Sequence, residues 1–167
     1  LVMYLRDHAL PLPAGVLVMS PWADLTCSGE SHETNFHRDP QFGGTTDNML
    51  HNSSYIGDAD PHAPYLSPMF GDFTDFPPTL IQVGSEEVLL SDSLTVARKL
   101  REAHRKLRIS VYDGMFHVFQ MALRLIPESR EAWEEAGRFL EIVYGVERTE
   151  EGRKVRLVRS NRKRKKR

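Results

Sequence analysis

The fold is decided by residues 77–119, which read PPTLIQVGSEEVLLSDSLTVARKLREAHRKLRISVYDGMFHVF. The run 79–83 is short and apolar, is entered through two prolines and is closed by a glycine, which is the pattern of a buried strand. The run 107–112 alternates apolar and polar residues before an Asp-Gly turn and predicts a second strand. Apolar residues at helical spacing predict a helix over 94–104 between the two strands.

A strand, a helix and a second strand form a βαβ unit, whose strands run parallel. Both carboxyl ends therefore open at the same edge of the sheet, where open α/β folds place their catalytic groups. Glu87 follows the first strand and His117 follows the second. A carboxylate bonded to one imidazole nitrogen leaves the other nitrogen free as a general base, so this pair is a candidate catalytic dyad. A structural role for a lone loop histidine remains the alternative.

The rest of the chain extends this unit into a fold of class α/β. The apolar run 15–20 predicts another strand, whose carboxyl end would place Trp22 and Asp24 near the pair. Residues 131–144 have helical spacing and stop at a glycine. The further expected elements are a helix end at 1–7, a solvated loop at 26–47, a short helix at 48–56, an irregular crossing at 62–76 and a short helix after His117.

Charge divides the chain into two parts. Residues 1–145 carry 11 Lys plus Arg and 20 Asp plus Glu, whereas residues 146–167 carry 11 basic and 3 acidic residues. The acidic part gives no indication of nucleic-acid binding by the folded domain. The basic part has too few apolar residues to fold alone, so we expect a disordered tail at 146–167. Its basic block could bind nucleic acid or an acidic membrane, and a solvated tail without a binding role is the alternative.

Several classes of protein are disfavoured by what the sequence lacks. Cys27 is the single cysteine, so no internal disulfide can form, and a cytoplasmic protein is expected. No apolar run reaches the length that spans a bilayer. The spacing of His32, His37 and Asp39 matches no closed set of metal ligands, so we expect no metal site there.

Four sequence blocks occur in order along residues 1–145: Ser20-Pro21-Trp22-Ala23-Asp24-Leu25-Thr26, then Tyr65-Leu66-Ser67-Pro68, then residues 77–93, then Asp113-Gly114-Met115-Phe116-His117-Val118-Phe119. Together they resemble the C-terminal half of the hormone-sensitive-lipase-like α/β-hydrolases. The resemblance implies the C-terminal half of an α/β-hydrolase sheet, with mostly parallel strands flanked by helices. It also implies a partial domain at 1–145, whose N-terminal half is missing.

The resemblance assigns roles to particular residues. In the family, the Gly-Met-x-His-x-Phe block carries the catalytic histidine, which corresponds to His117. The acid follows the strand that ends in Val-Gly-Ser and is usually Asp, but that position is Glu87 here. Asp92 lies in the same block and is the rival acid, although we interpret it as the N-cap of the following helix. The expected substrate-binding residues are Phe116 and Val118, which flank His117, and Trp22, which follows the strand predicted at 15–20.

One departure from the family concerns the nucleophile. The serine of these enzymes lies in a G-x-S-x-G turn, and no such motif occurs in this sequence. We therefore expect an N-terminally truncated carboxylic ester hydrolase, of the serine type and inactive alone, whose whole form acts on a small-molecule ester without a cofactor. The alternative is a non-catalytic hydrolase-like binding module. Members of the family often pair through the last strand and helix, which implies a homodimer.

Overall fold

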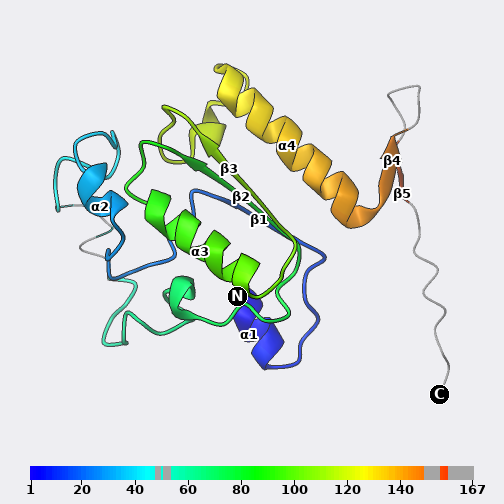
Figure 1. Ribbon diagram of the computed structural model, residues 1–167, viewed down its shortest axis with the longest axis horizontal. Helices are drawn as coiled ribbons and strands as arrows, with labels where there is room; N and C mark the ends of the chain where they lie inside the picture. Colours follow the sequence, from blue (N-terminus) through cyan, green and yellow to red (C-terminus); the bar gives the residue numbers. More distant parts are fainter. Residues whose placement is uncertain (48–49, 51–53, 149–154, 158–167) are drawn as a thin grey trace.

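The computed structural model describes residues 1–47, 50, 54–148 and 155–157. At its centre is a sheet of three parallel strands in the spatial order β1-β2-β3 (Figure 1). The strands are β1 (Val16–Met19), β2 (Thr79–Gly84) and β3 (Leu107–Tyr112). Val16 lies opposite Thr79, which in turn lies opposite Leu107. The three predicted strands and their parallel arrangement are therefore confirmed.

Strand β2 is the most enclosed element, because it pairs with a strand on each side. All of its residues are buried, as expected for a largely apolar strand that is covered on both faces. Its two polar side chains are both hydrogen-bonded. Thr79 Oγ1 donates to the Pro77 carbonyl at 2.9 Å, and Gln82 Nε2 donates to the Ala132 carbonyl at 2.8 Å. Burial of the strand therefore leaves neither side chain unsatisfied.

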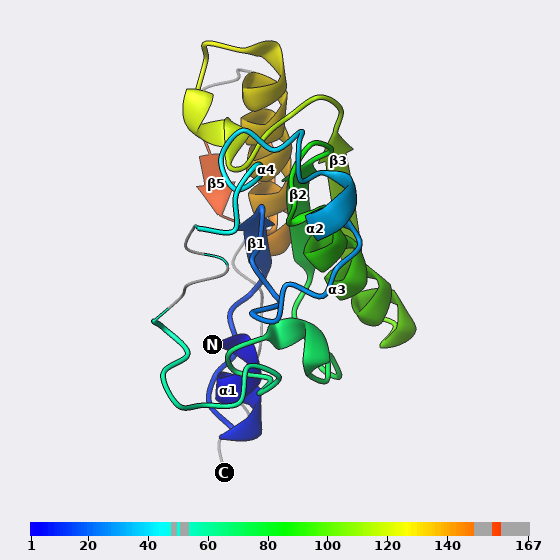
Figure 2. The same ribbon diagram turned by 90° about the vertical axis from the view of Figure 1, so that its left-hand side faces the viewer.

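Helices α3 (Leu90–Glu102) and α4 (Pro127–Tyr144) cover opposite faces of the sheet (Figures 1 and 2). Ile81 of β2 belongs to the apolar core that includes Val96, Ala97 and Leu100 of α3. Its neighbour Gln82 binds α4 instead, because successive strand residues point to opposite faces. Each fully buried aliphatic side chain of this core contributes about 1.5–3 kcal/mol.

A buried carboxylate fastens α4 to the sheet. Glu135 accepts hydrogen bonds from Ser110 Oγ at 2.7 Å, from Gln82 Nε2 at 2.9 Å, from Tyr112 Oη at 3.2 Å and from Arg108 Nε. Burial raises the pKa of Glu135, but the hydrogen bonds from Ser110, Gln82 and Arg108 outweigh burial and hold that pKa below its usual value. The ionised form of Glu135 therefore stabilises the packing of α4 on β2 and β3.

The ends of α4 follow the sequence signals. Pro127 occupies its first turn, where the missing N–H costs nothing. Gly145 follows its last residue with a φ of 61°, a left-handed conformation that glycine adopts without a Cβ clash. The remaining described helices are short: α1 (Val2–Asp7), α2 (Ser31–Thr34), the 3-10 helix η1 (Pro68–Phe70) and the 3-10 helix η2 (Phe119–Ala122).

Two predictions for the segment after β1 have different outcomes. The solvated loop expected at 26–47 is wrong, because the segment contains α2 and buries Ser31, His32, Asn35 and Asp39. Asn35 and Asp39 are buried because their side chains bind the turn after β2, as described below. The predicted helix at 48–56 falls largely outside the described residues.

Within the segment 146–167, for which the sequence predicts a disordered tail, the structure describes two short paired strands. These are β4 (Val146–Arg148) and β5 (Val155–Leu157), which run antiparallel. They lie beyond the end of α4, apart from the main sheet (Figure 1). The other residues of this segment lie outside the description. No described helix combines the length and apolar character that crossing a bilayer requires.

Candidate active site

An acid and a histidine meet at the carboxyl ends of β2 and β3. His117 Nδ1 lies 3.1 Å from Glu87 Oε2. The Glu87 side chain is fully buried, whereas 21% of the His117 side chain is exposed. A carboxylate at this position accepts a hydrogen bond from Nδ1–H and thereby fixes the imidazole tautomer. Nε2 is then free to take a proton from a nucleophile.

The turns that carry these two residues are fastened to each other. Glu86 N donates to the Met115 carbonyl at 3.1 Å, and Gly114 N donates to Ser85 Oγ at 2.8 Å. Gly84 makes this approach possible, because a Cβ there would lie 2.1 Å from the Met115 carbonyl oxygen. The sequence predicted the two turns but not the glycine that lets them touch.

The second oxygen of Glu87 is also held. Oε1 accepts hydrogen bonds from Gly84 N at 2.6 Å and from Ser20 Oγ at 2.7 Å. Ser20 Oγ in turn accepts a hydrogen bond from Val118 N at 3.0 Å. Sequence reasoning missed Ser20. Its position directly after β1, at the edge where β2 and β3 also end, was the available signal.

The segment around α2 supports the acid from the other side, beyond the carboxyl ends of the strands (Figure 1). Asn35 Nδ2 donates to the carbonyls of Ser85, at 2.9 Å, and Glu87, at 2.8 Å. Asp39 Oδ2 accepts a hydrogen bond from Val88 N at 2.9 Å. The backbone on both sides of the Glu87 side chain is therefore fixed by two buried side chains. The sequence did not single out Asn35, and it offered Asp39 only as a metal ligand that the spacing disfavours.

Phe42 extends the same segment to the histidine. Its ring packs edge-on against the His117 imidazole, with centroids 4.8 Å apart and planes at 71°. Asp39 Oδ1 accepts a hydrogen bond from Phe42 N at 3.0 Å, so the carboxylate that holds the acid turn also holds this ring. Sequence reasoning also missed Phe42, because no periodic pattern marks a single aromatic residue in a loop.

The rival acid, Asp92, points elsewhere. Its Oδ2 accepts hydrogen bonds from Ala23 N and Asp24 N, both at 2.8 Å. Burial raises the pKa of Asp92. The N-cap interpretation of Asp92 is wrong, because α3 begins at Leu90 rather than at the predicted residue 94, and its N-cap position is Leu89. Asp92 instead binds the loop that leaves β1.

The three predicted substrate-binding residues differ in their surroundings. Trp22 packs with Phe42 in an apolar cluster around Leu50, and its indole donates to the Asp24 carbonyl at 2.9 Å. Phe116 is half-buried and precedes His117. Val118 follows His117 with a φ of 51°, and its N–H binds Ser20. A role in substrate binding stays a prediction for all three.

Cys27 is an unsuitable nucleophile. Burial, together with the negative charges of Asp24 and Asp92, raises the pKa of its thiol to about 11. The thiolate, which is the reactive form, is therefore rare at neutral pH. Within the described residues, no group of three or more His, Cys, Asp or Glu side chains could hold a metal ion.

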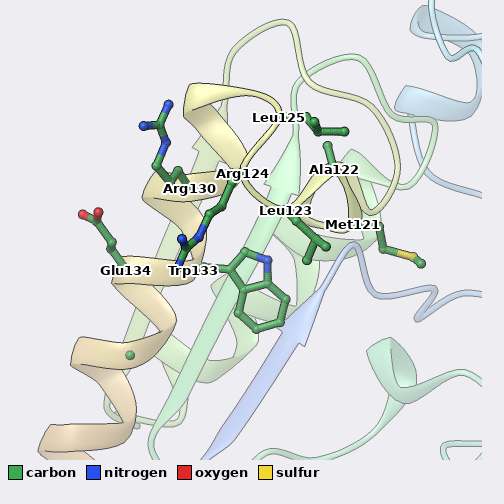
Figure 3. Close-up of a pocket in the computed structure, with 9 residues that line it drawn as sticks. Met121, Ala122, Leu123, Arg124, Leu125, Arg130, Trp133 and Glu134 are labelled. Carbon is green, nitrogen blue, oxygen red and sulfur yellow. The ribbon is translucent and has the colours of Figure 1, made fainter.

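An apolar hollow of about 1140 Å³ lies between η2 and the first half of α4 (Figure 3). Trp133 projects into it from α4, and Leu123 faces it from the η2 side. The lining segment η2 follows the His117 turn directly in the sequence. Neither His117 nor Glu87 lines the hollow, however. It is therefore a surface beside the candidate site rather than the place where the pair would act.

Comparison with known proteins gives consistent matches. The family model described as alpha/beta hydrolase fold matches residues 1–121. An acetyl-hydrolase of Streptomyces hygroscopicus is 41% identical over 141 residues, which cover 84% of this chain and 47% of that protein. An esterase of Acinetobacter venetianus is 34% identical over 139 residues, which cover 83% of this chain and 46% of that protein. The chain thus spans about half the length of these relatives.

Solved structures agree with the sequence matches. A hormone-sensitive lipase from a metagenome library superposes with a TM-score of 0.79 at 31% identity, covering 85% of this chain and 48% of that one. An esterase from the bacterial hormone-sensitive lipase family also gives 0.79, at 34% identity, covering 84% of this chain and 47% of that one. The chain belongs to the α/β-hydrolase family, within its hormone-sensitive-lipase-like group.

Proposed function

We propose that this chain supplies the acid and the histidine of a carboxylic ester hydrolase that acts by Ser-His-acid acyl transfer. The observation that carries the proposal is the 3.1 Å contact between His117 Nδ1 and the buried Oε2 of Glu87. The acetyl-hydrolase and esterase named among its relatives support the reaction class. They do not favour the alternative of a non-catalytic binding module.

In this mechanism, His117 Nε2 takes the proton of a serine hydroxyl as the serine oxygen attacks the ester carbonyl carbon. The imidazolium then gives that proton to the leaving alcohol as the C–O bond breaks. Water attacks the acyl-enzyme by the same route, which releases the acid and restores the serine. Glu87 accepts the Nδ1–H hydrogen bond throughout and thereby stabilises the imidazolium.

The nucleophile of this mechanism must come from other sequence, because none of the 167 residues lies in a G-x-S-x-G motif. The donors that stabilise the oxyanion are proposed to come from the same source. Without both, residues 1–167 would bind no acyl group covalently, and turnover by them alone is not expected. No cofactor takes part in these steps. Acetyl esters are the first substrates to test, given the name of the most identical relative reported above.

A chimeric enzyme tests the proposal. It joins residues 1–145 to the portion of the Streptomyces hygroscopicus acetyl-hydrolase that the match does not cover. We expect it to hydrolyse p-nitrophenyl acetate, and we expect His117→Ala to abolish the hydrolysis. His62→Ala is the matched control, since His62 Nδ1 also lies 3.1 Å from a carboxylate, that of Asp60, but the histidine side chain is 62% exposed. Unchanged hydrolysis by the His117→Ala chimera would refute the proposal.

A further inference from the structure

Ser20 joins the three strand ends that form the candidate site. It is the first residue after β1, and its backbone N–H continues the sheet by donating to the Gln82 carbonyl of β2 at 2.7 Å. Its hydroxyl donates a hydrogen bond to Glu87, which follows β2. The same hydroxyl accepts a hydrogen bond from the backbone N–H of Val118, which follows β3. Only 3% of Ser20 is exposed. A single buried hydroxyl therefore connects loops that are 67 and 98 residues away in the sequence.

The Ser20 hydroxyl makes one hydrogen bond as a donor and one as an acceptor. It donates its one proton to Glu87 Oε1 at 2.7 Å and accepts the Val118 N–H at 3.0 Å. Since Oε1 also accepts from Gly84 N, the rotation of the Glu87 carboxylate is fixed. The other oxygen, Oε2, is thereby directed at His117 Nδ1. The orientation of the acid and the position of the histidine turn thus depend on the same hydroxyl group.

The backbone at both ends of this contact is unusual. Ser20 has a φ of 49° and Val118 a φ of 51°, both in the left-handed region that non-glycine residues seldom occupy. The conformation is least favourable for a β-branched residue such as valine. Strained residues of this kind persist where surrounding interactions determine them, and they gather at functional sites. Here they aim the Ser20 hydroxyl and the Val118 N–H at each other.

We propose that Ser20 is a positioning residue of the active site, whose hydroxyl holds the Glu87 carboxylate and the His117 turn in register. Its catalytic meaning rests on the ester hydrolase function proposed above. The hydroxyl touches neither the imidazole nor a reacting atom, so it acts through Glu87 and through the Val118 backbone. Loss of the hydroxyl releases both supports at once, and the Nδ1–Oε2 hydrogen bond loses its fixed geometry.

The test uses the 167-residue chain and a spectroscopic signal of the contact itself. The His117 Nδ1 proton, bound to a buried carboxylate, should give a far-downfield ¹H NMR resonance, which ¹⁵N-histidine labelling and His117→Ala assign. We expect loss of this resonance in Ser20→Ala and in Ser20→Gly. The glycine variant removes the hydroxyl while relieving the strain of a positive φ, so it stays folded even where the alanine variant does not.

Ser67→Ala is the matched control. Ser67 is also fully buried, and its Oγ accepts a backbone N–H from the same loop, that of Leu25, at 2.8 Å, without contacting Glu87. The resonance should persist in this variant. An unchanged resonance in Ser20→Gly, or its loss in Ser67→Ala, would overturn the proposal, since the signal would then be independent of Ser20 or would report packing in general.

Kinetics in the chimeric enzyme provide the second readout. Ser20→Gly should lower kcat between about 10-fold and 100-fold with KM unchanged, as expected when a catalytic group is misplaced rather than when substrate binding is weakened. An equal rise in KM with kcat unchanged would contradict a positioning role. An inactive parent chimera, with the resonance still lost in the Ser20 variants, would count against the ester hydrolase function while supporting the role of Ser20.

Discussion

His32 Nε2 lies 3.6 Å from Asp92 Oδ1, so the rival acid faces a histidine other than His117. The other carboxylate oxygen of Asp92, Oδ2, accepts hydrogen bonds from the N–H groups of Ala23 and Asp24. In the chimeric enzyme, Asp92→Asn should therefore leave kcat within a few-fold of the parent, because an amide oxygen can still accept those N–H groups. Glu87→Gln should lower kcat by about 10³–10⁴, because it disturbs the tautomer of His117.

Steady-state hydrolysis of p-nitrophenyl acetate by both variants checks this assignment. Circular dichroism of each variant serves as the control for folding. A large loss of kcat in folded Asp92→Asn, with activity retained in Glu87→Gln, would assign the acid to Asp92 instead.

The sequence predicts those parts of the site that lie next to strands, because strands have recognisable local patterns of apolar and polar residues. The apolar run of β2 and the alternation of β3 locate the two strand ends, and parallel pairing then brings Glu87 and His117 together. The supports of the pair have no such pattern. Ser20 and Asn35 act on Glu87 across 67 and 52 residues of sequence, and neither lies in a repeat that indicates which loop it will meet.

The same distinction explains the errors in the prediction. A polar, glycine-containing stretch such as 26–47 indicates a solvated loop only when its polar groups have no partners in the fold. Here Asn35 and Asp39 satisfy backbone groups of the acid turn, so burial of these side chains costs little. Asp92 looks like an N-cap because Ser, Asp and Asn favour that position. A long-range contact with the loop after β1 overrides that preference.

Glu135 makes the stability of the chain depend on pH. Its pKa is depressed in the folded state, so its contribution to the free energy of unfolding is present above its ordinary pKa of 4.5 and is lost as pH falls through the folded value. We expect Glu135→Gln to lower the free energy of unfolding by about 1–3 kcal/mol at pH 7. This difference should shrink as the pH falls below about 4.5.

Thermal unfolding of the two proteins at neutral and acidic pH measures this difference. Glu134→Gln is the control, because Glu134 is exposed and its ion pair with Arg138 is loose, at 3.9 Å. A difference for Glu135→Gln that stays constant or grows on acidification would show that the charge of Glu135 does not stabilise the folded state.

We propose that β3, the last strand of the main sheet, and α4, the last helix, form a homodimer interface. β3 is an edge strand of the described sheet, and the C-terminal half of α4 exposes Leu140, Ile142 and Tyr144. Exposed apolar side chains beside an unpaired strand edge favour association with a second copy. Sedimentation velocity should show a dimer for the chain and a monomer for Ile142→Glu, since Ile142 is 80% exposed. Leu125→Glu, near the other end of α4, is the control and should remain dimeric.

A basic tail is expected to account for any binding to nucleic acid. Residues 146–167 carry 11 basic and 3 acidic residues, whereas residues 1–145 are acidic. Fluorescence anisotropy with a labelled RNA should show affinity that falls steeply with salt and disappears when 146–167 are deleted. Anionic vesicles in the same series test attraction to acidic membranes. Binding that survives the deletion would place the nucleic-acid contact on the folded part of the chain.

We expect Glu87 and His117 to act as one catalytic unit, and a double-mutant cycle in the chimeric enzyme measures the coupling between them. The variants are Glu87→Ala, His117→Ala and the combination of the two, and the quantity is kcat/KM for p-nitrophenyl acetate. The double variant should lose no more kcat/KM than His117→Ala alone, because the acid acts only through the imidazole. Losses that multiply, as they do for independent sites, would contradict it.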